Sequence, residues 1–446
     1  MAVSSGINVG LMGLGVVGGG VAAVLVERPD IISRKIGQPI RLKKALVRDV
    51  GKPRSPNLPS GMLTTDPEDI LGDSEIHILV ELMGGTEPAV DYMAQALAAG
   101  KHVVTANKEA MAKHGPALVS LAKSNGVNLL FEASVGGGIP IVGCLMNQLA
   151  ANDVRSIHSI INGTTNYILT RMAYDGTGFN QALKEAQQKG YAEADPTKDI
   201  EGIDAVYKLA ILASLAFHQW IGFEKIYCQG ISRLQPQDFR YAQELGYAIK
   251  PLAIASLIDG AIKARVHPAL VPQNQMLAKV DGVYNAVEVE GSLCGNVLFH
   301  GMGAGSEPTT SAVMGDVIEV ARRHVFQSGL PTPGLAGEET SQPTALQGEG
   351  GGTWAIGSID DLVCRYYLRL NVADRPGVLA QIARILGDGQ ISIASVLQKD
   401  ANAAEQTAEI VITTHPSREA SVQGSLRAIA DLEGVREVNN LIRIEE

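Results

Sequence analysis

A glycine-rich turn near the start of the chain constrains the fold more than any other feature of the sequence. Residues 7–12 are apolar as in a buried strand, GLGVVG follows at Gly13–Gly18, and the next residues have the apolar spacing of a helix. In such a turn Gly13 permits the bend, Gly15 lets backbone approach a pyrophosphate, and Gly18 allows close packing. Free N–H groups at the helix start attract phosphate. A purely structural turn is the alternative to a dinucleotide site formed by Gly13, Leu14, Gly15, Val16, Val17 and Gly18.

Strand and helix patterns alternate after this turn. Apolar runs separated by helix-length segments predict a parallel, doubly wound (Rossmann-type) sheet, with strands near residues 40–47, 76–85, 102–111 and 128–138. A second glycine turn precedes a helix predicted over Pro308–Arg322, which indicates that the chain returns to the first domain. We therefore expect a dinucleotide-binding domain over 1–139, completed by about 301–330, and an α+β domain for substrate binding and dimerisation over 140–300.

The end of the second predicted strand bears on the choice of cofactor. Arg48 and Asp49 follow this strand, where a dinucleotide fold distinguishes a ribose hydroxyl from a 2′-phosphate. Arg48, with Lys43 and Lys44 nearby, favours NADP. Asp49 is suited to the ribose hydroxyls of NAD, so both cofactors stay open, as does a plain charged strand end.

Composition excludes several classes of partner. The formal net charge of −10 gives no general attraction to nucleic acid or to anionic lipid. The four cysteines lack C-x-x-C spacing, which favours reduced thiols in a cytoplasmic protein. The apolar stretch at residues 6–26 lacks a basic segment before it and is interrupted by glycines, so we expect neither a signal peptide nor a membrane span.

A separate unit is predicted at the C-terminal end. Residues 331–358 are rich in Gly, Pro, Glu and Thr, which is typical of a linker. Beyond them, Cys364–Ile444 has the pattern βαββαβ of a ferredoxin-like module, which we place at 359–446. Because the linker is polar and the pattern is complete, we expect this module to be removable without loss of the upstream activity.

An acidic stretch ends in a lysine at the start of an apolar helix. The stretch is YAEADPTKDIEGIDAVYK at residues 191–208, and the helix is predicted over Asp199–Phe217. Asp204 and Lys208 are four residues apart, so they lie on one face of this helix. An ion pair that only stabilises the helix is one interpretation. A lysine tuned for proton transfer is the other, because burial lowers a lysine pKa and a carboxylate raises it.

Two more strand ends have unusual sequences. Lys108 in TANK lies where parallel strands open onto a ligand crevice, so it fits a cofactor phosphate, a substrate carboxylate or an ordinary surface position. In FEASVGGGIPI, three glycines beside Glu132 free backbone carbonyls that suit a hard cation, although the residues alone favour a plain turn.

Together these motifs resemble homoserine dehydrogenases. AQQKGYAEADPTKDIEGIDAVYK at Ala186–Lys208 is similar to the signature of that family, and GLGVVG, TANK, EASVGGGIP and NGTTNYIL occur in the family's order. The resemblance covers about residues 6–325. NVADRPGVLAQIA at Asn371–Ala383 resembles an ACT domain, an amino-acid-sensing unit.

The resemblance implies reversible hydride transfer between L-aspartate 4-semialdehyde and L-homoserine with NADP or NAD. It implies that Lys208 protonates the aldehyde oxygen and that Asp204 positions the substrate. Substrate binding would involve Glu193, Asp199, Asp204 and Thr164. Cofactor binding would add Arg48, Lys108, Gly190 and Gly303. A sodium or potassium ion would be held by the backbone oxygens of Glu132, Val135, Gly137 and Ile139.

Other functions remain open at this level. A non-catalytic sensor of nucleotides and amino acids has the same frame, but it needs neither Lys108 nor Lys208. Another NADP-linked aldehyde reductase is the third candidate, and the acidic pocket argues against substrates without an amine. We expect a homodimer or homotetramer, and a terminal module that either binds threonine as an effector or only assembles subunits.

Overall fold

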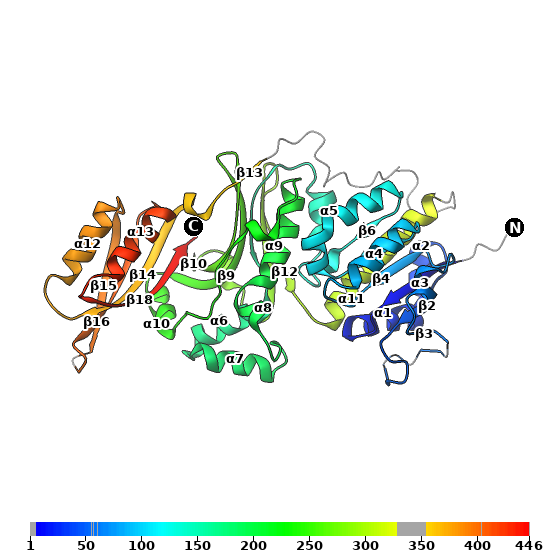
Figure 1. The fold of residues 1–446 in the computed structure, drawn as a ribbon, viewed down its shortest axis with the longest axis horizontal. Helices are drawn as coiled ribbons and strands as arrows, with labels where there is room; N and C mark the ends of the chain where they lie inside the picture. Colours follow the sequence, from blue (N-terminus) through cyan, green and yellow to red (C-terminus); the bar gives the residue numbers. More distant parts are fainter. Residues whose placement is uncertain are drawn as a thin grey trace.

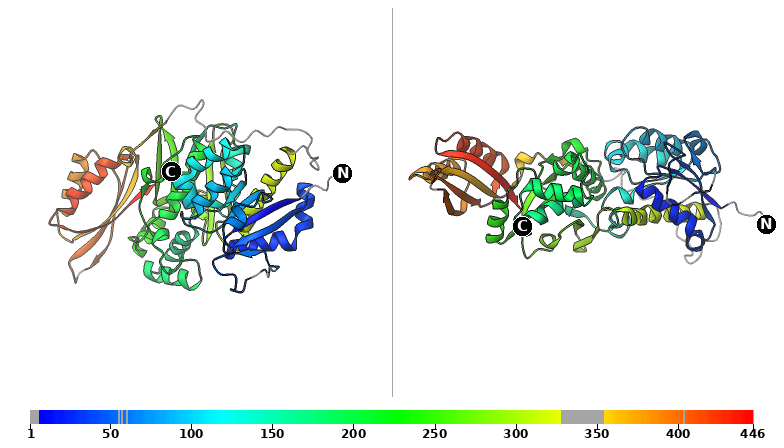
Figure 2. Two further views of the ribbon diagram at one scale, coloured as in Figure 1. Left: turned by 45° about the vertical axis from the view of Figure 1, so that its right-hand side comes forward. Right: turned by 90° about the horizontal axis from the view of Figure 1, so that it is seen from below.

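The computed structural model describes residues 6–54, 56, 58–59, 61–327, 354–402 and 404–445. Three regions lie in a row (Figure 1): an N-terminal region of residues 6–139 with 306–327, a central region of residues 140–302, and a C-terminal region of residues 354–445. Figure 2 shows the row from below and shows strand β18 (Val435–Ile444) reaching from the C-terminal region toward the central one.

A parallel sheet of six strands forms the N-terminal region, in the order β3-β2-β1-β4-β5-β6. The strands are β1 (Ile7–Met12), β2 (Ile40–Leu46), β3 (Leu63–Thr64), β4 (Ile78–Glu81), β5 (His102–Thr105) and β6 (Leu129–Leu130). One face packs on α1 (Val16–Glu27), α2 (Pro29–Ile36) and α11 (Ser306–Gln327). The other packs on α3 (Glu68–Leu71), α4 (Ala89–Ala98) and α5 (Lys108–Ser124). The predicted doubly wound sheet is confirmed.

Helix α11 brings the chain back to the N-terminal region, as the second glycine turn predicts. Its apolar residues belong to the same core as those of α1 and α2. At its start, the Ser306 hydroxyl donates a hydrogen bond to the carbonyl of Val16 at 3.2 Å. Further along, Arg322 Nε donates to the Lys35 carbonyl at 3.1 Å. The helix therefore places residues 303–306 beside the glycine turn.

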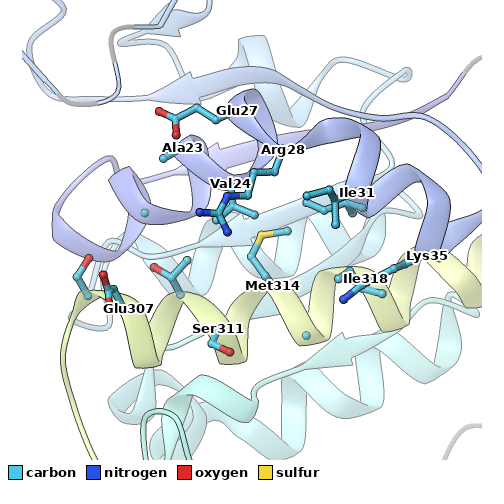
Figure 3. A pocket seen from close by; sticks show the side chains of 15 residues that line it. Ala23, Val24, Glu27, Arg28, Ile31, Lys35, Glu307, Ser311, Met314 and Ile318 are labelled. Carbon is cyan, nitrogen blue, oxygen red and sulfur yellow. The ribbon is translucent and has the colours of Figure 1, made fainter.

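A groove of about 820 Å³ lies on the outer surface between α11 and the pair α1 and α2. Figure 3 shows Met314 and Ile318 of α11 facing Arg28 and Ile31 across this groove. The residues that line it include neither the acidic stretch nor Gly13, Gly15 or Gly18. The groove is therefore separate from the place where the predicted catalytic residues meet.

The central region is a mixed sheet covered by helices. Its strands follow the order β12-β11-β7-β9-β10. They are β7 (Val154–Ile160), β9 (Tyr247–Ile258), β10 (Ala261–Pro272), β11 (Tyr284–Gly291) and β12 (Gly295–Met302), with the short β8 (Tyr227–Cys228) on β10. The helices are α6 (Gly163–Asp175), α7 (Phe179–Gln188), α8 (Thr197–Ile200), α9 (Ile203–Ala216) and α10 (Pro236–Glu244). Apolar residues of α9 share one core with α4 and α5, so the first two regions are firmly joined.

The C-terminal region has the predicted βαββαβ order. Its antiparallel strands lie in the order β18-β14-β16-β15. They are β14 (Val363–Ala373), β15 (Ile393–Asn402), β16 (Thr407–Thr414) and β18, with a short β17 (Ser417–Arg418) beside β14. Helices α12 (Val378–Asp388) and α13 (Glu419–Ala430) complete its core. The ferredoxin-like prediction is confirmed.

This C-terminal region is not a separate body, contrary to the expectation of a removable module. Strand β18 pairs in parallel with β10, Ala269 opposite Arg443 and Leu270 opposite Ile444, so both regions share one sheet of twelve strands. Tyr367, Val411, Ile442 and Ile444 also belong to the apolar core of α6, α7 and α10. The pairing of β18 with β10 was not predictable from the sequence. Local hydrophobic periodicity identifies each strand, but it does not show which distant strand will pair with it.

The predicted linker, 331–358, lies mostly outside the described residues. Within it, β13 (Ala355–Ile356) pairs with β10, so this end of the linker is a strand and the linker prediction is wrong there. None of the described helices is long and apolar enough to cross a membrane. All four cysteines, Cys144, Cys228, Cys294 and Cys364, are free thiols, as expected from their spacing.

Candidate active site

The glycine turn leaves an open helix N-terminus. Gly13 has φ of +98°, and a Cβ there would lie 2.7 Å from the Leu82 carbonyl oxygen. A Cβ on Gly18 would lie 2.0 Å from the Gly13 carbonyl oxygen, so helix and turn touch. A Cβ on Gly15, the N-cap of α1, would meet nothing within 4 Å. The first N–H groups of α1 therefore face free space, with Leu14, Val16 and Val17 around them, as a pyrophosphate site requires.

The charged residues near the end of β2 differ in their hydrogen-bond and ion-pair partners. Lys43 pairs with Asp73 and Glu75, and Lys44 donates to the Gly61 carbonyl at 2.9 Å. The Asp49 carboxylate accepts from the backbone N–H of Gly51 at 2.8 Å. Arg48 is exposed and has no hydrogen bond or ion pair with any residue that the structure describes. Of these cations, Arg48 is the one whose charge is available to a ligand.

One carboxylate brings two lysines together where α5 and α9 run side by side (Figure 1). Asp204 is 4% exposed. Its Oδ2 lies 2.6 Å from Lys208 Nζ, and its Oδ1 lies 2.6 Å from Lys108 Nζ. Lys208 Nζ also donates to the Ile161 carbonyl at 2.9 Å. Lys108 belongs to the N-terminal region and Lys208 to the central one, so the carboxylate bridges the two.

The helix that carries Asp204 and Lys208 begins later than predicted. Instead of one helix over Asp199–Phe217, the chain forms α8 and then α9, separated at Gly202 with φ of +84°. A glycine adopts this left-handed conformation without steric cost, so the chain turns there. The turn leaves Asp204 in the first turn of α9 and brings Asp199 of α8 near it. Both carboxylates accept from Asn162 Nδ2 at 2.8 Å.

Burial and charge give the two lysines different properties. Burial lowers the pKa of Lys208 below its ordinary value, even though Asp204 opposes the change. Burial also acts to lower the pKa of Lys108, but the Asp204 charge outweighs it, so this pKa is raised. The side chain of Lys208 is 11% exposed and that of Lys108 is 44% exposed. Lys208 thus gives up a proton more readily, whereas Lys108 stays charged.

The carboxylates of the pocket also differ. Burial would raise the pKa of Asp204, but the two ammonium groups hold it well below its ordinary value. Burial raises the pKa of Asp199, and the Asp204 charge adds to the rise, while the hydrogen bond from Asn162 opposes it. Two ion pairs thus set the direction of the shift for Asp204, whereas burial sets it for Asp199. Asp204 contacts two ammonium groups, and Asp199 forms no ion pair with the residues that the structure describes.

The rest of the acidic stretch does not converge on Lys208. Glu193 is exposed on the loop after α7, and its charge contributes to the raised pKa of Lys108. Asp195 accepts from the hydroxyl of Thr197 at 2.6 Å, within the loop. Glu201 accepts from the Ser232 hydroxyl at 3.2 Å. Asp195 and Glu201 therefore stabilise the local chain, and only three of the five carboxylates face the lysines.

Two predicted residues shape the loop that holds Glu193. Gly190 has φ of +74° directly after α7. The Thr164 hydroxyl donates to the carbonyl of Tyr191 at 2.6 Å, which ties this loop to the start of α6. An ion pair of 3.0 Å between Lys198 and Glu109 fastens α8 to α5. These two contacts tie the chain on either side of Glu193 to α6 and to α5.

Position 303 has no room for a side chain, which the sequence alone does not reveal. A Cβ there would lie 1.9 Å from Asn285 Nδ2, so the buried amide of Asn285 fills the space of a side chain. Gly303 in turn lies against Gly137, whose own Cβ would be 2.5 Å from the Gly303 carbonyl. The predicted cofactor loop and the predicted cation loop therefore pack on each other.

The predicted cation loop has backbone carbonyl oxygens without hydrogen-bond donors among the described residues. Gly136 and Gly137 have φ of +74° and +56°, which bends the backbone after Glu132. The carbonyl oxygens of Val135 and Gly137 accept no hydrogen bond from the described residues, whereas those of Glu132 and Ile139 accept one each. The Glu132 carboxylate accepts from the N–H groups of Val142 and Gly143 at 2.8 and 2.6 Å. Such carbonyls suit a hard monovalent cation in ligand type.

Known proteins match this chain along its length. Family models match residues 13–132 ("Homoserine dehydrogenase, NAD binding domain"), 140–318 ("Homoserine dehydrogenase") and 366–434 ("ACT domain"). A homoserine dehydrogenase of Neisseria gonorrhoeae is 42% identical over 440 residues and is covered to 98%, as is this chain. The chain belongs to the homoserine dehydrogenase family. It is an oxidoreductase that acts on a CH–OH group, with an NAD-binding domain and an ACT domain.

Solved homoserine dehydrogenases have the same fold. The crystal structure from Thiobacillus denitrificans is 45% identical, has a TM-score of 0.90, and the match covers 99% of this chain and 98% of that one. A hyperthermophilic archaeal homoserine dehydrogenase in complex with NADPH is 26% identical, with a TM-score of 0.60, over 73% of this chain and 99% of that one. The fold and the family expected from the signature are confirmed.

Within this homoserine dehydrogenase fold, sequence reasoning missed Asn162 and the Ile161 carbonyl. Asn162 directly precedes α6 and caps it, and its side chain accepts from the Thr165 N–H at 2.9 Å. An asparagine before a helix is a recognisable capping signal, so the cap was predictable. The bonds from the same amide to Asp199 and Asp204 were not, because they join residues that only the tertiary fold brings together.

Proposed function

We propose that the protein interconverts L-aspartate 4-semialdehyde and L-homoserine in the pocket where α5 meets α9, with NADPH as the preferred cofactor. The observation that carries this proposal is the buried Asp204 carboxylate shared by Lys108 and Lys208. One of these lysines has a lowered pKa and the other a raised one. Such a pair supplies a proton donor and a fixed positive charge in one pocket.

Lys208 carries the proton in this proposal. When bound, NADPH supplies the hydride to the aldehyde carbon. Lys208 donates its proton to the aldehyde oxygen as the hydride arrives, which gives the alcohol and a neutral amine; in the reverse direction the neutral amine takes the hydroxyl proton. Asp204 and the Ile161 carbonyl hold Lys208 Nζ at 2.6 and 2.9 Å, which leaves one N–H of the ammonium group for the substrate.

The amino group of the substrate needs negative charge, and two carboxylates offer it. Asp199 lies beside Asp204 without a lysine of its own, and Glu193 lies on the loop above them. Thr164 fastens that loop and lines the same side. Lys108 fits the opposite requirement, a positive charge between cofactor and substrate. A substrate without an ammonium group would leave Asp199 and Glu193 unpaired.

Arg48 supports the preference for NADPH. Its guanidinium has no partner among the described residues, unlike the ammonium groups of Lys43 and Lys44, and a bidentate contact to a phosphate is a strong one. We expect Arg48→Ala to weaken NADPH roughly 10- to 150-fold, as the loss of a charge-assisted contact implies, and to change NADH little. Lys44→Ala is the matched control and should affect both cofactors alike. Equal losses of NADPH and NADH in Arg48→Ala would remove this role.

A sodium or potassium ion would be held by the carbonyls of Glu132, Val135, Gly137 and Ile139. Two of these oxygens accept no hydrogen bond from the part of the chain that the structure describes, and Gly137 touches the Gly303 loop. When bound, such an ion would supply a fixed positive charge between the two loops. We propose that Gly303 and Gly190 contribute to the cofactor site through their backbone conformation, because neither has a side chain.

Assembly and regulation complete the proposal. We infer a homodimer or homotetramer formed through the central region, supported by β12 as an edge strand of the shared sheet with few buried residues. We propose that the ACT domain binds threonine. We also propose that the protein is cytoplasmic, which its four free thiols support. A threonine titration of the steady-state rate tests the binding of threonine, and no change at any concentration leaves the domain with assembly alone.

The fall of NADPH absorbance on addition of aspartate 4-semialdehyde tests the activity. Wild-type protein should oxidise NADPH, and Lys208→Ala should lose roughly 10²–10⁴-fold in turnover while its affinity for NADPH holds, because proton transfer is the lost contribution. Absence of turnover in the wild-type protein would refute the activity. Near-normal turnover of Lys208→Ala would refute only the role of Lys208.

A further inference from the structure

Asn162 uses every hydrogen-bonding group of its side chain. The residue is 7% exposed and lies between the end of β7 and the start of α6. Its Oδ1 accepts from the N–H and the hydroxyl of Thr165 at 2.9 and 3.0 Å. Its Nδ2 donates to Asp199 Oδ1 and to Asp204 Oδ2, both at 2.8 Å. This orientation of the amide is the one that fits, because carboxylates only accept and a backbone N–H only donates.

The two carboxylates would separate without this amide. Asp199 and Asp204 belong to α8 and α9, which are divided at Gly202, and their like charges repel. Asp204 is also held by Lys108 and Lys208, but Asp199 has no lysine partner among the described residues. Asn162 is therefore the group that fastens Asp199 to the reactive centre. A neutral amide that donates to both carboxylates offsets part of their repulsion.

We propose that Asn162 is a positioning residue that holds the ammonium-binding carboxylate of Asp199 at a fixed distance from the Asp204–Lys208 pair. The inference rests on the proposed function, because it assigns the substrate amine to Asp199 and the substrate aldehyde to Lys208. One amide then fixes the separation between the two ends of the substrate. It also favours the ionised form of Asp199, which the amine requires.

The charges that face Asp199 give the sign of the expected pH effect. They are Asp204 and Lys208 on α9 and Lys108 on α5. Burial and the Asp204 charge raise the pKa of Asp199, and the Asn162 donor lowers it. Without that donor, Asp199 becomes protonated at a higher pH. The acid limb of the kcat/KM profile for reduction of aspartate 4-semialdehyde should therefore move to higher pH, because this direction needs Lys208 protonated and leaves Asp199 to set the acid limb.

Two variants keep the cap of helix α6 and remove the pair of hydrogen bonds from residue 162 to Asp199 and Asp204. Asn162→Ser retains a capping oxygen, but its single hydroxyl cannot donate to two carboxylates. We expect a KM for homoserine raised roughly tenfold at neutral pH, the size of one hydrogen bond to a charged group, and a smaller rise at high pH. Asn162→Asp also caps well but adds a third negative charge, so it should move the acid limb further than Asn162→Ser. The KM for NADP should change less than about twofold in both, since neither touches the glycine turn.

Thr165→Val is the matched control. It removes the hydroxyl that donates to Asn162 on the capping side and leaves both carboxylate bonds in place. We expect it to lower the melting temperature without moving the acid limb. An acid limb that stays at the wild-type pH in Asn162→Ser and Asn162→Asp, or that moves equally in Thr165→Val, would overturn the proposal and leave Asn162 as a cap. Wild-type turnover in the same pH series reports separately on the proposed function, and if one Asn162 variant fails to fold, the other decides.

Discussion

Two buried aspartates organise the two junctions of this chain, and they differ in the cations that pair with them. Asp204 joins the N-terminal and central regions and contacts Lys108 and Lys208, with Asn162 donating to it. Asp238 joins the central and C-terminal regions, is 0% exposed, and contacts Arg369 Nε at 2.7 Å. Asn440 and Tyr367 donate to it at 2.6 and 3.2 Å. A carboxylate with an asparagine donor and a basic partner thus occurs at both junctions.

The difference between them lies in what the cation can do. A buried lysine changes its pKa readily and can release a proton, whereas an arginine keeps its charge in all conditions that proteins meet. The Asp204 centre also has an exposed side through Lys108, while Arg369 is 1% exposed. We therefore propose that the Asp204 carboxylate takes part in chemistry, whereas the Asp238 carboxylate holds two regions together. A buried ion pair alone does not identify an active site.

Removal of the C-terminal region should have the largest effect. A chain stopped near Leu330 loses Arg369, Tyr367 and Asn440, so Asp238 loses its ion pair and two hydrogen bonds and becomes exposed to solvent. It also exposes β10 and the apolar residues that Ile442 and Ile444 cover. We expect the truncated chain to aggregate or to unfold at a much lower temperature. A soluble truncated protein with wild-type turnover and melting temperature would show that the junction contributes little.

Asp238→Ala tests the same junction in the full chain. It leaves Arg369 buried with Glu409 as its remaining carboxylate, so we expect a loss of roughly 3–5 kcal/mol in the free energy of unfolding. Turnover per folded molecule should stay within about twofold. Glu409→Gln is the control, because this partner is more exposed and its loss should destabilise less. Urea unfolding of the three proteins gives the order, and a greater loss in Glu409→Gln would reverse our assignment.

Lys108→Ala should have a smaller effect, visible in the pH profile. The charge of Lys108 helps to lower the pKa of Lys208, after burial. Its removal raises that pKa, so homoserine oxidation, which needs the neutral amine, should begin at a higher pH. We expect kcat for oxidation to fall roughly three- to tenfold at neutral pH and to recover at alkaline pH. Asp238→Ala should leave this profile unchanged, and an identical profile in both variants would contradict the comparison.

The sequence was informative where the signal is local. Gly13, Gly15 and Gly18 predicted the nucleotide fold because glycine spacing reflects backbone geometry in a single turn. Asp204 and Lys208 were paired from their spacing alone, since residues four apart share a helix face. The βαββαβ order was likewise predicted from hydrophobic periodicity.

Contacts between distant segments were not predictable in this way. Lys108 was placed at a crevice, but not on Asp204, because its partner lies in another region of the chain. The bonds of Asn162 and the pairing of β18 with β10 also depend on how whole elements pack. The break at Gly202 was missed for a different reason: a single glycine within a helical pattern is often tolerated, and here it adopts a positive φ instead.

A reciprocal exchange of the two cations tests the central claim most directly. Lys208→Arg keeps the positive charge beside Asp204 but cannot donate a proton near neutral pH, and Arg369→Lys keeps the charge beside Asp238. The measurement is turnover with NADPH and aspartate 4-semialdehyde at a fixed fraction of folded protein. We predict at least a roughly 100-fold loss in Lys208→Arg, and turnover within about twofold of wild type in Arg369→Lys despite a lower melting temperature. Near-normal turnover of Lys208→Arg would contradict the account, because charge alone would then suffice at Asp204.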